Sequence, residues 1–284
     1  MSIAIVVPTI RDIFNFKSKW ADLIKKHSAD LIIVYDGKNP IVELNNKKYS
    51  IKDIMGRKYA DLIYHFNDGI RNVGFALAGE LKYDYILSLD DDVTPIGDTI
   101  QDHLDALNKK YPISWLNTSM TEYMRGFPYN LREEAECWVS HGVWEGIPDY
   151  DGIRQLSGGI KKQEFYKGPI PRGVLFPMCA MNFCFKREAL PYIYQFPATL
   201  GVNRFCDIFG GIECKKDLDR LGKCAITGFS KVYHERMSNP YDNLIKEAKG
   251  IRLNDNYELS QNDEYFILSQ EKRKRWKEFV NNFV

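Results

Sequence analysis

The stretch Tyr85-Ile86-Leu87-Ser88-Leu89 is followed directly by Asp90-Asp91-Asp92. The apolar run predicts a buried strand, and the three acids at its carboxyl end predict a cation site, because clustered carboxylates raise one another's pKa unless a cation neutralises them. A hard divalent ion such as Mn²⁺ or Mg²⁺ takes oxygen ligands and bridges diphosphates, so the expected guest is a nucleotide-linked substrate. The alternative is an acidic cap or turn ahead of a helix that starts after Gly97.

Strand-like and helical segments alternate around this stretch. Apolar runs at residues 3–7 and 31–35 predict two earlier strands, separated by a segment with apolar residues at helical spacing. Helical spacing returns at residues 70–81 and 100–107. This βαβα order predicts an α/β fold with a mostly parallel central sheet flanked by helices, in which ligands collect at the carboxyl ends of strands.

The composition of the sequence changes after Tyr111, where Gly, Pro, Tyr and Trp become frequent. Periodicity fades between residues 126 and 167, and a long irregular stretch of this kind is more often a substrate loop than a connector. Regular structure is expected again near residue 175, with a helix over residues 211–221 and a strand over residues 225–232.

We predict one domain over residues 1–250, with a nucleotide-binding half at 1–110 and a sugar-binding half at 111–250. A C-terminal helical extension is expected over residues 251–284. Within it Trp276, Phe279, Val280 and Phe283 recur at i, i+3, i+4 and i+7. Such a helix packs on the body or on a second subunit, which makes a homo-oligomer possible, or else lies on a membrane surface.

Composition restricts the classes of partner. The 39 basic and 38 acidic side chains nearly cancel, so nucleic acid is not an expected partner. No apolar run approaches the roughly 20 residues that cross a bilayer, and the first eight residues lack the pattern of a signal peptide. We therefore expect a soluble, cytoplasmic protein. Its six scattered cysteines are expected to be buried free thiols rather than a zinc site or disulfide framework.

Four separated segments are suited to a nucleotide diphosphate. Two of them, residues 8–11 and 36–37, end predicted strands with polar groups. The third, Gly69-Ile70-Arg71-Asn72-Val73-Gly74, begins a helix, where free backbone N–H groups and an arginine fork favour phosphate oxygens. The acidic triplet is the fourth. The residues predicted to bind the nucleotide are Pro8, Thr9, Arg11, Asp36, Gly37, Arg71, Asn72, Asp90 and Asp91.

His234 follows the apolar segment 230–233 and is a further candidate for the metal. An imidazole at a strand end suits Mn²⁺, whereas a lone histidine can equally be a hydrogen-bonded structural residue. The residues alone leave both roles of His234 open.

A series of motifs runs in order from residue 7 to about residue 250. They occupy residues 7–11, 71–74, 90–92, 127–133, 140–144, 147–151, 175–182, 204–211 and 234–240. With these motifs the chain resembles the reversibly glycosylated polypeptides of plants, also called UDP-arabinopyranose mutases, and their microbial relatives. The resemblance implies a glycosyltransferase-A-like fold, a divalent Mn²⁺ or Mg²⁺, and a UDP-sugar substrate.

The resemblance also assigns residues. The family's acidic triplet corresponds to residues 90–92 and its downstream metal histidine to His234, so the predicted metal ligands are Asp90, Asp92 and His234. The arginine that is reversibly glycosylated in the plant proteins corresponds to Arg132, whose alternative role is structural pairing with Glu133 or Glu134. Asp207 is predicted to contact the sugar or act as a base, and the motif residues Asn182 and His141 are predicted to contact the sugar.

The chain departs from the plant pattern at three places. Cys206 stands where the plant proteins have the first of two adjacent acids, and Ala180 replaces a glycine. The tail after about residue 250 has no counterpart in the motif series.

The implied activity is a metal-dependent mutase that interconverts pyranose and furanose forms of a UDP-linked sugar, most specifically UDP-L-arabinose. Autoglycosylation and a place in cell-wall or surface-polysaccharide synthesis go with this expectation. The alternatives are a glycosyltransferase that passes the sugar to a separate acceptor, and a non-catalytic UDP-sugar-binding subunit.

Overall fold

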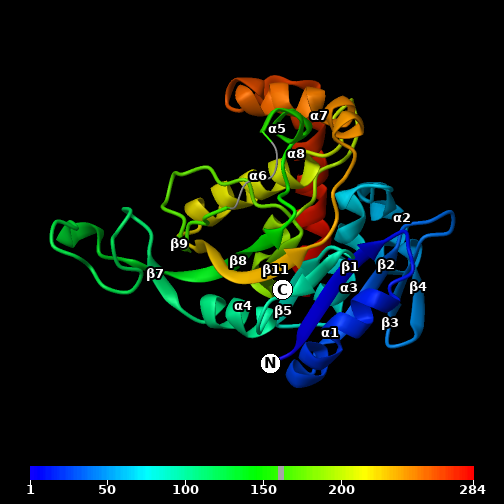
Figure 1. Cartoon of the computed structure of the whole chain (residues 1–284), viewed down its shortest axis with the longest axis horizontal. Coiled ribbons are helices and arrows are strands. Elements are labelled where there is room, and N and C mark those ends of the chain that lie inside the picture. Colours follow the sequence, from blue (N-terminus) through cyan, green and yellow to red (C-terminus); the bar gives the residue numbers. More distant parts are fainter. Residues whose placement is uncertain (159–162) are drawn as a thin grey trace.

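The computed structural model describes residues 1–158 and 163–284, and a single twisted sheet runs through it with helices on both faces (Figure 1). Its strands follow the order β4-β3-β2-β1-β5-β10-β8-β11-β6, with β7 paired to β8 and β9 paired to β11. The strands are β1 (Ile3–Thr9), β2 (Asp30–Tyr35), β3 (Ile41–Leu44), β4 (Lys47–Ser50), β5 (Tyr85–Leu89), β6 (Val93–Pro95), β7 (Lys110–Pro112), β8 (Glu134–Gly146), β9 (Gly168–Pro169), β10 (Asn182–Lys186) and β11 (Cys224–His234).

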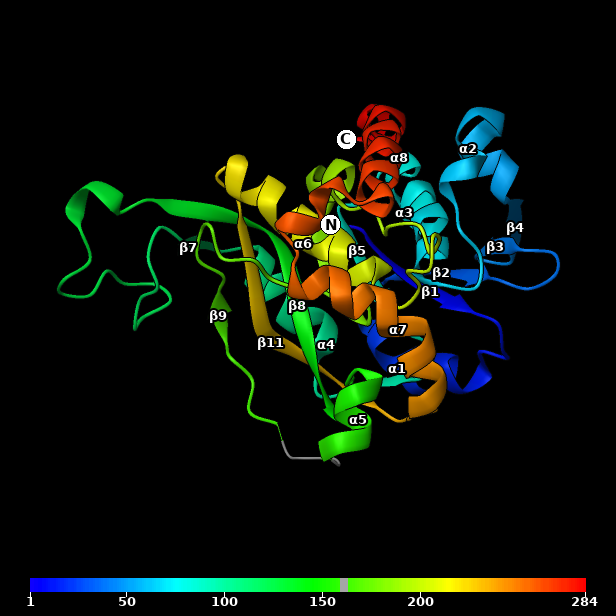
Figure 2. The same cartoon turned by 90° about the horizontal axis from the view of Figure 1, so that it is seen from above.

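The helices come from segments with apolar residues on one side. They are α1 (Phe14–His27), α2 (Ile51–Tyr59), α3 (Arg71–Glu80), α4 (Thr99–Leu107), α5 (Gly152–Gly158), α6 (Cys206–Arg220), α7 (Pro240–Asp255) and α8 (Glu264–Val280). Viewed from above, α3, α6 and α8 lie together on one side of the sheet, and α1 and α4 lie on the other (Figure 2).

Parallel pairing, as predicted from the βαβα pattern, occurs on both sides of strand β10. β1 pairs in parallel with both β2 and β5, and β8 pairs in parallel with β11. β10 is antiparallel to its neighbours β5 and β8, and further antiparallel pairs extend the sheet at both ends. The α/β architecture with a central sheet, flanking helices and a C-terminal helix is therefore confirmed.

Alternation along β1 divides the core into two layers. Ala4 and Val6 point to the side covered by α3, whereas Ile3, Ile5 and Val7 point to the side covered by α1 and α4. Burial on both faces explains the continuous apolar run, since a central parallel strand has no solvent side. β5 is likewise buried at all five positions, which brings the acidic triplet to the edge of the core.

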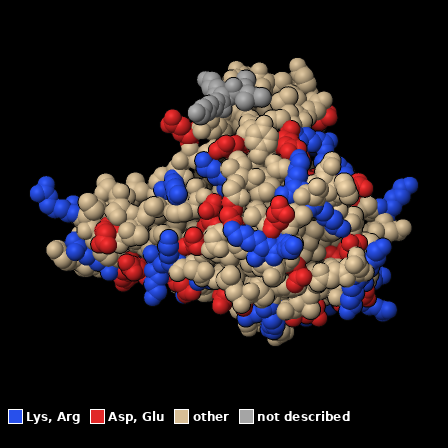
Figure 3. All heavy atoms as spheres, turned by 60° about the horizontal axis from the view of Figure 1, so that its bottom comes forward, with Lys and Arg blue, Asp and Glu red and all other residues tan. Residues whose placement is uncertain are grey.

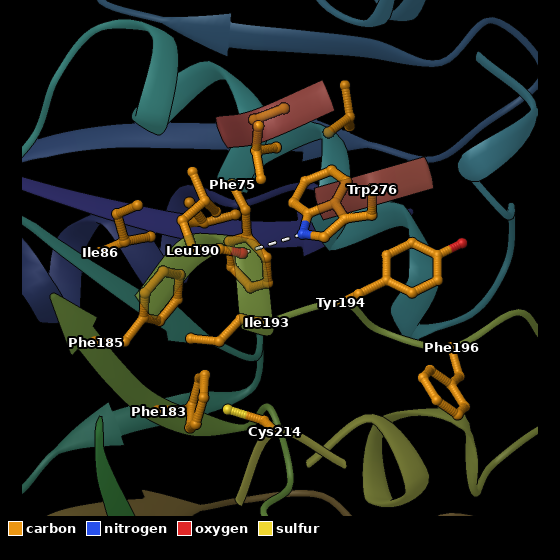
Figure 4. Packing of buried hydrophobic residues seen from close by; sticks show 14 of the residues in the cluster. Phe75, Ile86, Phe183, Phe185, Leu190, Ile193, Tyr194, Phe196, Cys214 and Trp276 are labelled. Atoms are coloured by element: carbon orange, nitrogen blue, oxygen red, sulfur yellow. Dashed lines mark hydrogen bonds between the residues drawn. The ribbon is translucent and has the colours of Figure 1, made fainter. Parts of the chain in front are cut away.

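The C-terminal helix α8 packs on the body of the same chain (Figure 4). Trp276 is fully buried in the cluster with Phe75 and Tyr194, and its indole N–H donates to the carbonyl of Leu190 at 3.1 Å. This contact confirms the packing on the body that the apolar spacing predicted. The domain boundary at residue 250 stays a prediction, and α7 runs across that position.

Two predicted elements differ from the structure in extent or position. Helix α6 begins at Cys206, five residues before the predicted start, and it ends where Gly222 adopts the expected left-handed conformation (φ 65°). The stretch predicted to be an irregular loop instead contains β8, a 13-residue strand inside the sheet. Within the predicted stretch of residues 126–167, connections precede and follow β8, and helix α5 comes after the second connection. Residues 159–162 of that stretch lie outside the described residues.

All six cysteines are buried free thiols, as predicted.

Candidate functional site

The acidic triplet lies where β5 leaves the sheet and continues into β6. Because β1 is parallel to β5, the carboxyl ends of both strands meet at the same edge. Below the triplet, the fully buried guanidinium of Arg71 donates to Ser88 Oγ and to the carbonyl of Leu89, each at 3.0 Å. It also pairs with the carboxylates of Asp90 and Asp68, so the start of α3 is tied to the triplet.

Asp91 is bound by the end of β1. Thr9 Oγ1 donates to its carboxylate at 2.6 Å, and the Arg11 guanidinium lies 3.2 Å from its other oxygen. The Thr9 hydroxyl in turn accepts from the backbone N–H of Arg11 at 3.0 Å. These bonds explain why a polar Thr-x-Arg sequence ends an otherwise apolar strand.

Asp92 faces His234, which β11 brings to the same edge. His234 Nδ1 donates to the carbonyl of Ile147 at 2.8 Å, a bond that leaves Nε2 unprotonated in the neutral ring and available to a ligand. Nε2 lies 3.9 Å from the Asp92 carboxylate, too far for a hydrogen bond. Burial, followed by the charge of Asp90, raises the pKa of Asp92, as expected for carboxylates that lack a neutralising cation.

The triplet borders a hollow of about 280 Å³, called here the first hollow. Asp36 closes it on one side and is only 2% exposed, accepting from His65 Nδ1 at 2.8 Å and from the backbone N–H of Phe66. The lining residues are Pro8, Thr9, Ile10, Arg11, Asp36, Phe66, Asn67, Asp68, Ile70, Asp90, Asp91 and Asp92.

A second hollow of about 430 Å³ lies on the other side of Asp90. Asp149, Asp207 and Arg204 line it together with Asp68, and a third hollow of about 640 Å³ extends from Asp149 past His234. Asp90 lines all three hollows, so it stands at their junction.

Two carboxylates of the second hollow resist ionisation. Burial, with the charges of Asp68 and Asp149, raises the pKa of Asp207 well above its ordinary value. Desolvation in the hollow raises the pKa of Asp149 to about 6 although Arg204 lies 3.9 Å away and opposes the shift. Raised pKa values suit carboxyl groups to proton transfer.

Arg71 and four other residues predicted for the site do not line the hollows. Asn72 is fully buried and exchanges hydrogen bonds of 2.9 Å with the backbone of Gln195. Asn182 Oδ1 accepts from His103, and Gly37 is exposed outside the first hollow's lining. His141 lies behind the wall, where its Nε2 is 3.4 Å from the Sγ of the lining residue Cys179.

Arg132 is not brought to the hollows either. It lies two residues before β8, and its side chain stacks on Tyr129 at 3.6 Å from the ring centroid and donates to the carbonyl of Phe127. The strand's other end, Gly146, pairs with His234. At about 3.3 Å per residue, the two ends of β8 lie on the order of 40 Å apart. Arg132 is therefore not brought to the triplet of its own chain, and the role that the resemblance assigns to it stays a prediction.

Four residues of the second hollow escaped the sequence interpretation. They are Asp68, Asp149, Arg204 and Glu247. Arg204 Nε donates to Glu247 at 2.8 Å, and Glu247 also accepts from the backbone N–H of Gly152 at 2.6 Å. No local pattern marks them, because each lies in a loop or on a helix. Membership of Asp149 and Arg204 in the motif series was the only available signal.

A second group of potential ligand atoms lies beside the triplet. Asp68, Cys206 and Asp207 have such atoms within 4.8 Å of one another. Cys206, however, is buried with a raised pKa, and its thiol donates to the carbonyl of Asn203 at 2.9 Å. A protonated thiol suits a hard cation poorly, whereas the oxygens of Asp90 and Asp92 and the imidazole of His234 are donor types that Mn²⁺ and Mg²⁺ accept. Within the described residues, these three side chains do not come within the same 4.8 Å of one another.

Comparison with known protein families shows to which family this chain belongs. Residues 1–261 match the family model described as reversibly glycosylated polypeptide. The chain belongs to this family. Probable UDP-arabinopyranose mutase 4 of Arabidopsis thaliana is 34% identical over 275 residues, which cover 87% of this chain and 73% of the plant protein. UDP-arabinopyranose mutase 1 of the same plant is 35% identical over 275 residues, which cover 87% of this chain and 75% of the plant protein. UDP-arabinopyranose mutase 1 of Oryza sativa subsp. japonica is 33% identical over 276 residues, which cover 87% of this chain and 73% of the rice protein.

Among solved structures, glucosyl-3-phosphoglycerate synthase of Mycobacterium tuberculosis, in complex with Mn²⁺ and UDP-glucose, gives a TM-score of 0.47 at 13% identity. The match covers 89% of this reversibly glycosylated polypeptide and 78% of the synthase. Mannosyl-3-phosphoglycerate synthase of Rubrobacter xylanophilus gives 0.43 at 12% identity, covering 90% and 75%.

The surface of this family member carries both signs of charge. On the face shown in Figure 3, Lys and Arg are interspersed with Asp and Glu rather than gathered into one basic region. Within the described ranges, no helix combines the length and the apolarity that crossing a bilayer requires.

Proposed function

We propose that this protein is a UDP-sugar mutase that interconverts UDP-L-arabinopyranose and UDP-L-arabinofuranose with the help of Mn²⁺ or Mg²⁺. The observation that carries the proposal is the family match over residues 1–261, together with plant relatives that are named UDP-arabinopyranose mutases and are about 34% identical over 87% of the chain. The three hollows that meet at Asp90 support it, because a nucleotide sugar has three parts to accommodate.

The nucleoside belongs in the first hollow. Its polar wall of Thr9, Arg11 and Asp36 offers both donors and an acceptor to a base and ribose. The diphosphate then lies at the triplet, and the sugar lies over the second hollow near Asp149 and Asp207. Arg71 is a positioning residue in this arrangement, because its guanidinium is already bound to Asp90 and Asp68 beneath the triplet.

The donor set fits a divalent cation. Asp90, Asp92 and His234 would hold it, since their oxygens and the free Nε2 meet the ligand preferences of Mn²⁺ and Mg²⁺. When bound, the ion supplies positive charge that stabilises the departing diphosphate.

Ring contraction requires a defined exchange of bonds and protons. The bond from C1 to the phosphate oxygen breaks, O4 replaces the ring oxygen on C1, and UDP returns. The ring oxygen must gain a proton and O4 must lose one. Asp149 and Asp207 suit this exchange, because both line the second hollow and burial raises the pKa of each carboxyl group. Asp207 thus keeps its predicted place at the sugar.

One assay tests the proposed activity. The protein is incubated with UDP-L-arabinopyranose and Mn²⁺, and the nucleotide sugars are separated by chromatography. A new UDP-sugar isomer supports the mutase. Release of free UDP without an isomer would instead indicate a transferase or hydrolase, and calorimetric UDP binding without turnover would indicate a non-catalytic binding subunit.

A further inference from the structure

Residues 113–133 form an arm that projects from the body between β7 and β8 (Figures 1 and 2). Its aromatic side chains pack mainly on one another, with Phe127 between Trp115 and Tyr123. Phe127 belongs to neither of the two core clusters of the body. The arm therefore carries its own small apolar cluster, with Arg132 at its base.

The arm exposes apolar surface that a monomer does not cover. Tyr129 is 84% exposed, Leu116 68% and Trp115 50%. Adjacent large apolar side chains at the surface indicate a contact with another macromolecule. The Arg132 Nε and the Tyr123 hydroxyl are also buried, and neither has a hydrogen-bond partner among the described residues. The base of the arm therefore has two polar atoms that can still form hydrogen bonds.

Arg132 cannot reach the second hollow of its own chain while the sheet is intact. Antiparallel pairs between β7 and β8, Pro112 with Glu134 and Tyr111 with Ala135, fix both ends of the arm at the far end of the sheet. Arg132 is two positions from Glu134, which allows about 7 Å of extended backbone. The residue of β8 behind the wall of the hollow, His141, lies seven positions beyond Glu134, which is about 23 Å along the strand.

The second hollow has the chemistry to receive a guanidinium. It is lined by Asp68, Asp90, Asp149, Asp207 and Glu247, and Arg204 is the one basic residue in its described lining. An entering arginine would meet several carboxylates, and its planar fork is well matched to them.

We propose that the arm of one subunit enters the second hollow of another copy of this chain and presents Arg132 to the sugar bound there. This inference rests on the proposed function. The apolar tip of the arm supplies contact area, and the acidic hollow supplies charge complementarity. The site is then complete only in an oligomer.

In the transfer step, the bond from C1 to the phosphate oxygen breaks, and its electron pair stays on UDP. A bond forms between C1 and a nitrogen of Arg132 of the partner subunit. The proton displaced from that nitrogen passes to a carboxylate of the hollow, for which Asp149 is suited by position. Return of UDP reverses each change. Activation by a carboxylate is needed because free arginine keeps its proton up to a pH of about 12 or above.

Subunit mixing tests the proposal. Arg132→Ala removes the arm's arginine and leaves the hollow intact, whereas Asp92→Asn impairs the metal site and leaves the arm intact. Each variant alone is expected to be inactive. After exchange of subunits, an intact hollow meets an intact arm in about one pairing in four, so the 1:1 mixture should recover about a quarter of wild-type mutase activity.

Two further readouts keep the test decisive. With UDP-sugar labelled in the sugar and subunits distinguished by a mass tag, the label should appear on the Asp92→Asn subunit in the mixture. Arg57→Ala, which removes an exposed arginine on α2, is the matched control and should stay active alone. Circular dichroism and native mass spectrometry establish folding and subunit exchange for every variant.

Contrary outcomes are distinct. An active monomer, an active Arg132→Ala variant, or exchanged subunits that recover no activity would each overturn the role of the arm. In these cases, isomerisation by the wild-type protein would still support the proposed mutase activity. A wild type that does not isomerise UDP-arabinopyranose would overturn the proposed function and, with it, this inference.

Discussion

At the scale of single residues, the most consequential ion pair is that of Arg71 with Asp90. Arg71 is 2% exposed, and its guanidinium is bound on all sides by Ser88, the carbonyl of Leu89 and two carboxylates. Removing one partner of a buried pair leaves the other uncompensated. The residue therefore couples the start of α3 to the metal site.

Replacement of Arg71 by Met should destabilise the protein by about 2–4 kcal/mol, less than for a fully enclosed pair because Asp90 is partly exposed. Urea denaturation measures this loss. Arg71→Lys should recover part of the lost stability and a smaller part of the lost UDP affinity. Lysine keeps the positive charge but lacks the planar guanidinium that makes paired hydrogen bonds. An Arg71→Met protein as stable as the wild type would show that the ion pair contributes little to the stability of the fold.

His234 should decide metal affinity. Its Nδ1 is occupied by the carbonyl of Ile147, so Nε2 is the atom that remains for an ion. Loss of that ligand in His234→Ala is expected to weaken Mn²⁺ binding in the presence of UDP at least tenfold, or by about 1.4 kcal/mol. Titration calorimetry measures the affinity, and His27→Gln on α1 serves as the control. Equal affinity in wild type and His234→Ala would exclude the histidine as a ligand.

Asp149 should make stability depend on pH. Its pKa of about 6 in the folded protein lies above the ordinary value of 3.8, so the unfolded chain loses this proton first as pH rises. The contribution of Asp149 thus lowers stability progressively between about pH 4 and 6 and stays unfavourable at pH 7. Without added metal, Asp149→Asn should raise the urea midpoint at pH 7, and the gain should shrink toward pH 4. A gain that is constant with pH would contradict the shifted carboxyl.

Strand-end residues could be foreseen in the sequence, but the hollow behind them could not. Thr9, Asp36 and Asp90 each follow an apolar run, and parallel strands bring such ends to one edge. Asp68 and Asp149 lie in loops, and only the folding of the chain brings them to the same hollow.

At the scale of elements, β8 shows why a central strand was missed. Strand patterns are recognised by apolar alternation, yet its middle carries Ser140 and His141, both buried. Hydrogen bonds compensate them: Ser140 Oγ is 2.8 Å from His103, and His141 Nδ1 is 3.0 Å from Thr227. Because these partners lie 37 and 86 residues away, the local sequence gives no sign that the polar groups are satisfied inside a sheet.

Helix α8 should contribute strongly to stability. Trp276 is fully buried, packs on Tyr194 and satisfies its indole N–H at Leu190. Trp276→Ala is expected to cost about 3–5 kcal/mol through lost burial and a residual cavity. Chemical denaturation measures the cost, with the exposed Lys274→Ala on the same helix as control. A cost below about 1 kcal/mol would mean that α8 is only loosely attached.

At the scale of the whole molecule, the metal-binding edge and the arm lie at opposite ends of β8. The strand is rigidly held by β10 and β11 on its two sides, so neither end can move toward the other without breaking the sheet. This separation connects enzyme activity to assembly, because a residue that acts on the sugar from the arm has to act on another subunit.

Excision of the arm should separate binding from turnover. Pro112 and Glu134 are directly paired, so residues 114–132 can be replaced by Asn-Gly to give a short turn between β7 and β8. Phe127 belongs to neither core cluster, and Met120 is the excised residue that packs against one of them. The shortened protein should therefore fold and bind UDP with Mn²⁺ as wild type does, measured by circular dichroism and calorimetry. It should lack mutase activity and recover about a quarter of it when mixed with Asp92→Asn subunits, which still carry the arm. An excised protein that isomerises UDP-arabinopyranose on its own would show that the hollow needs nothing from a neighbour.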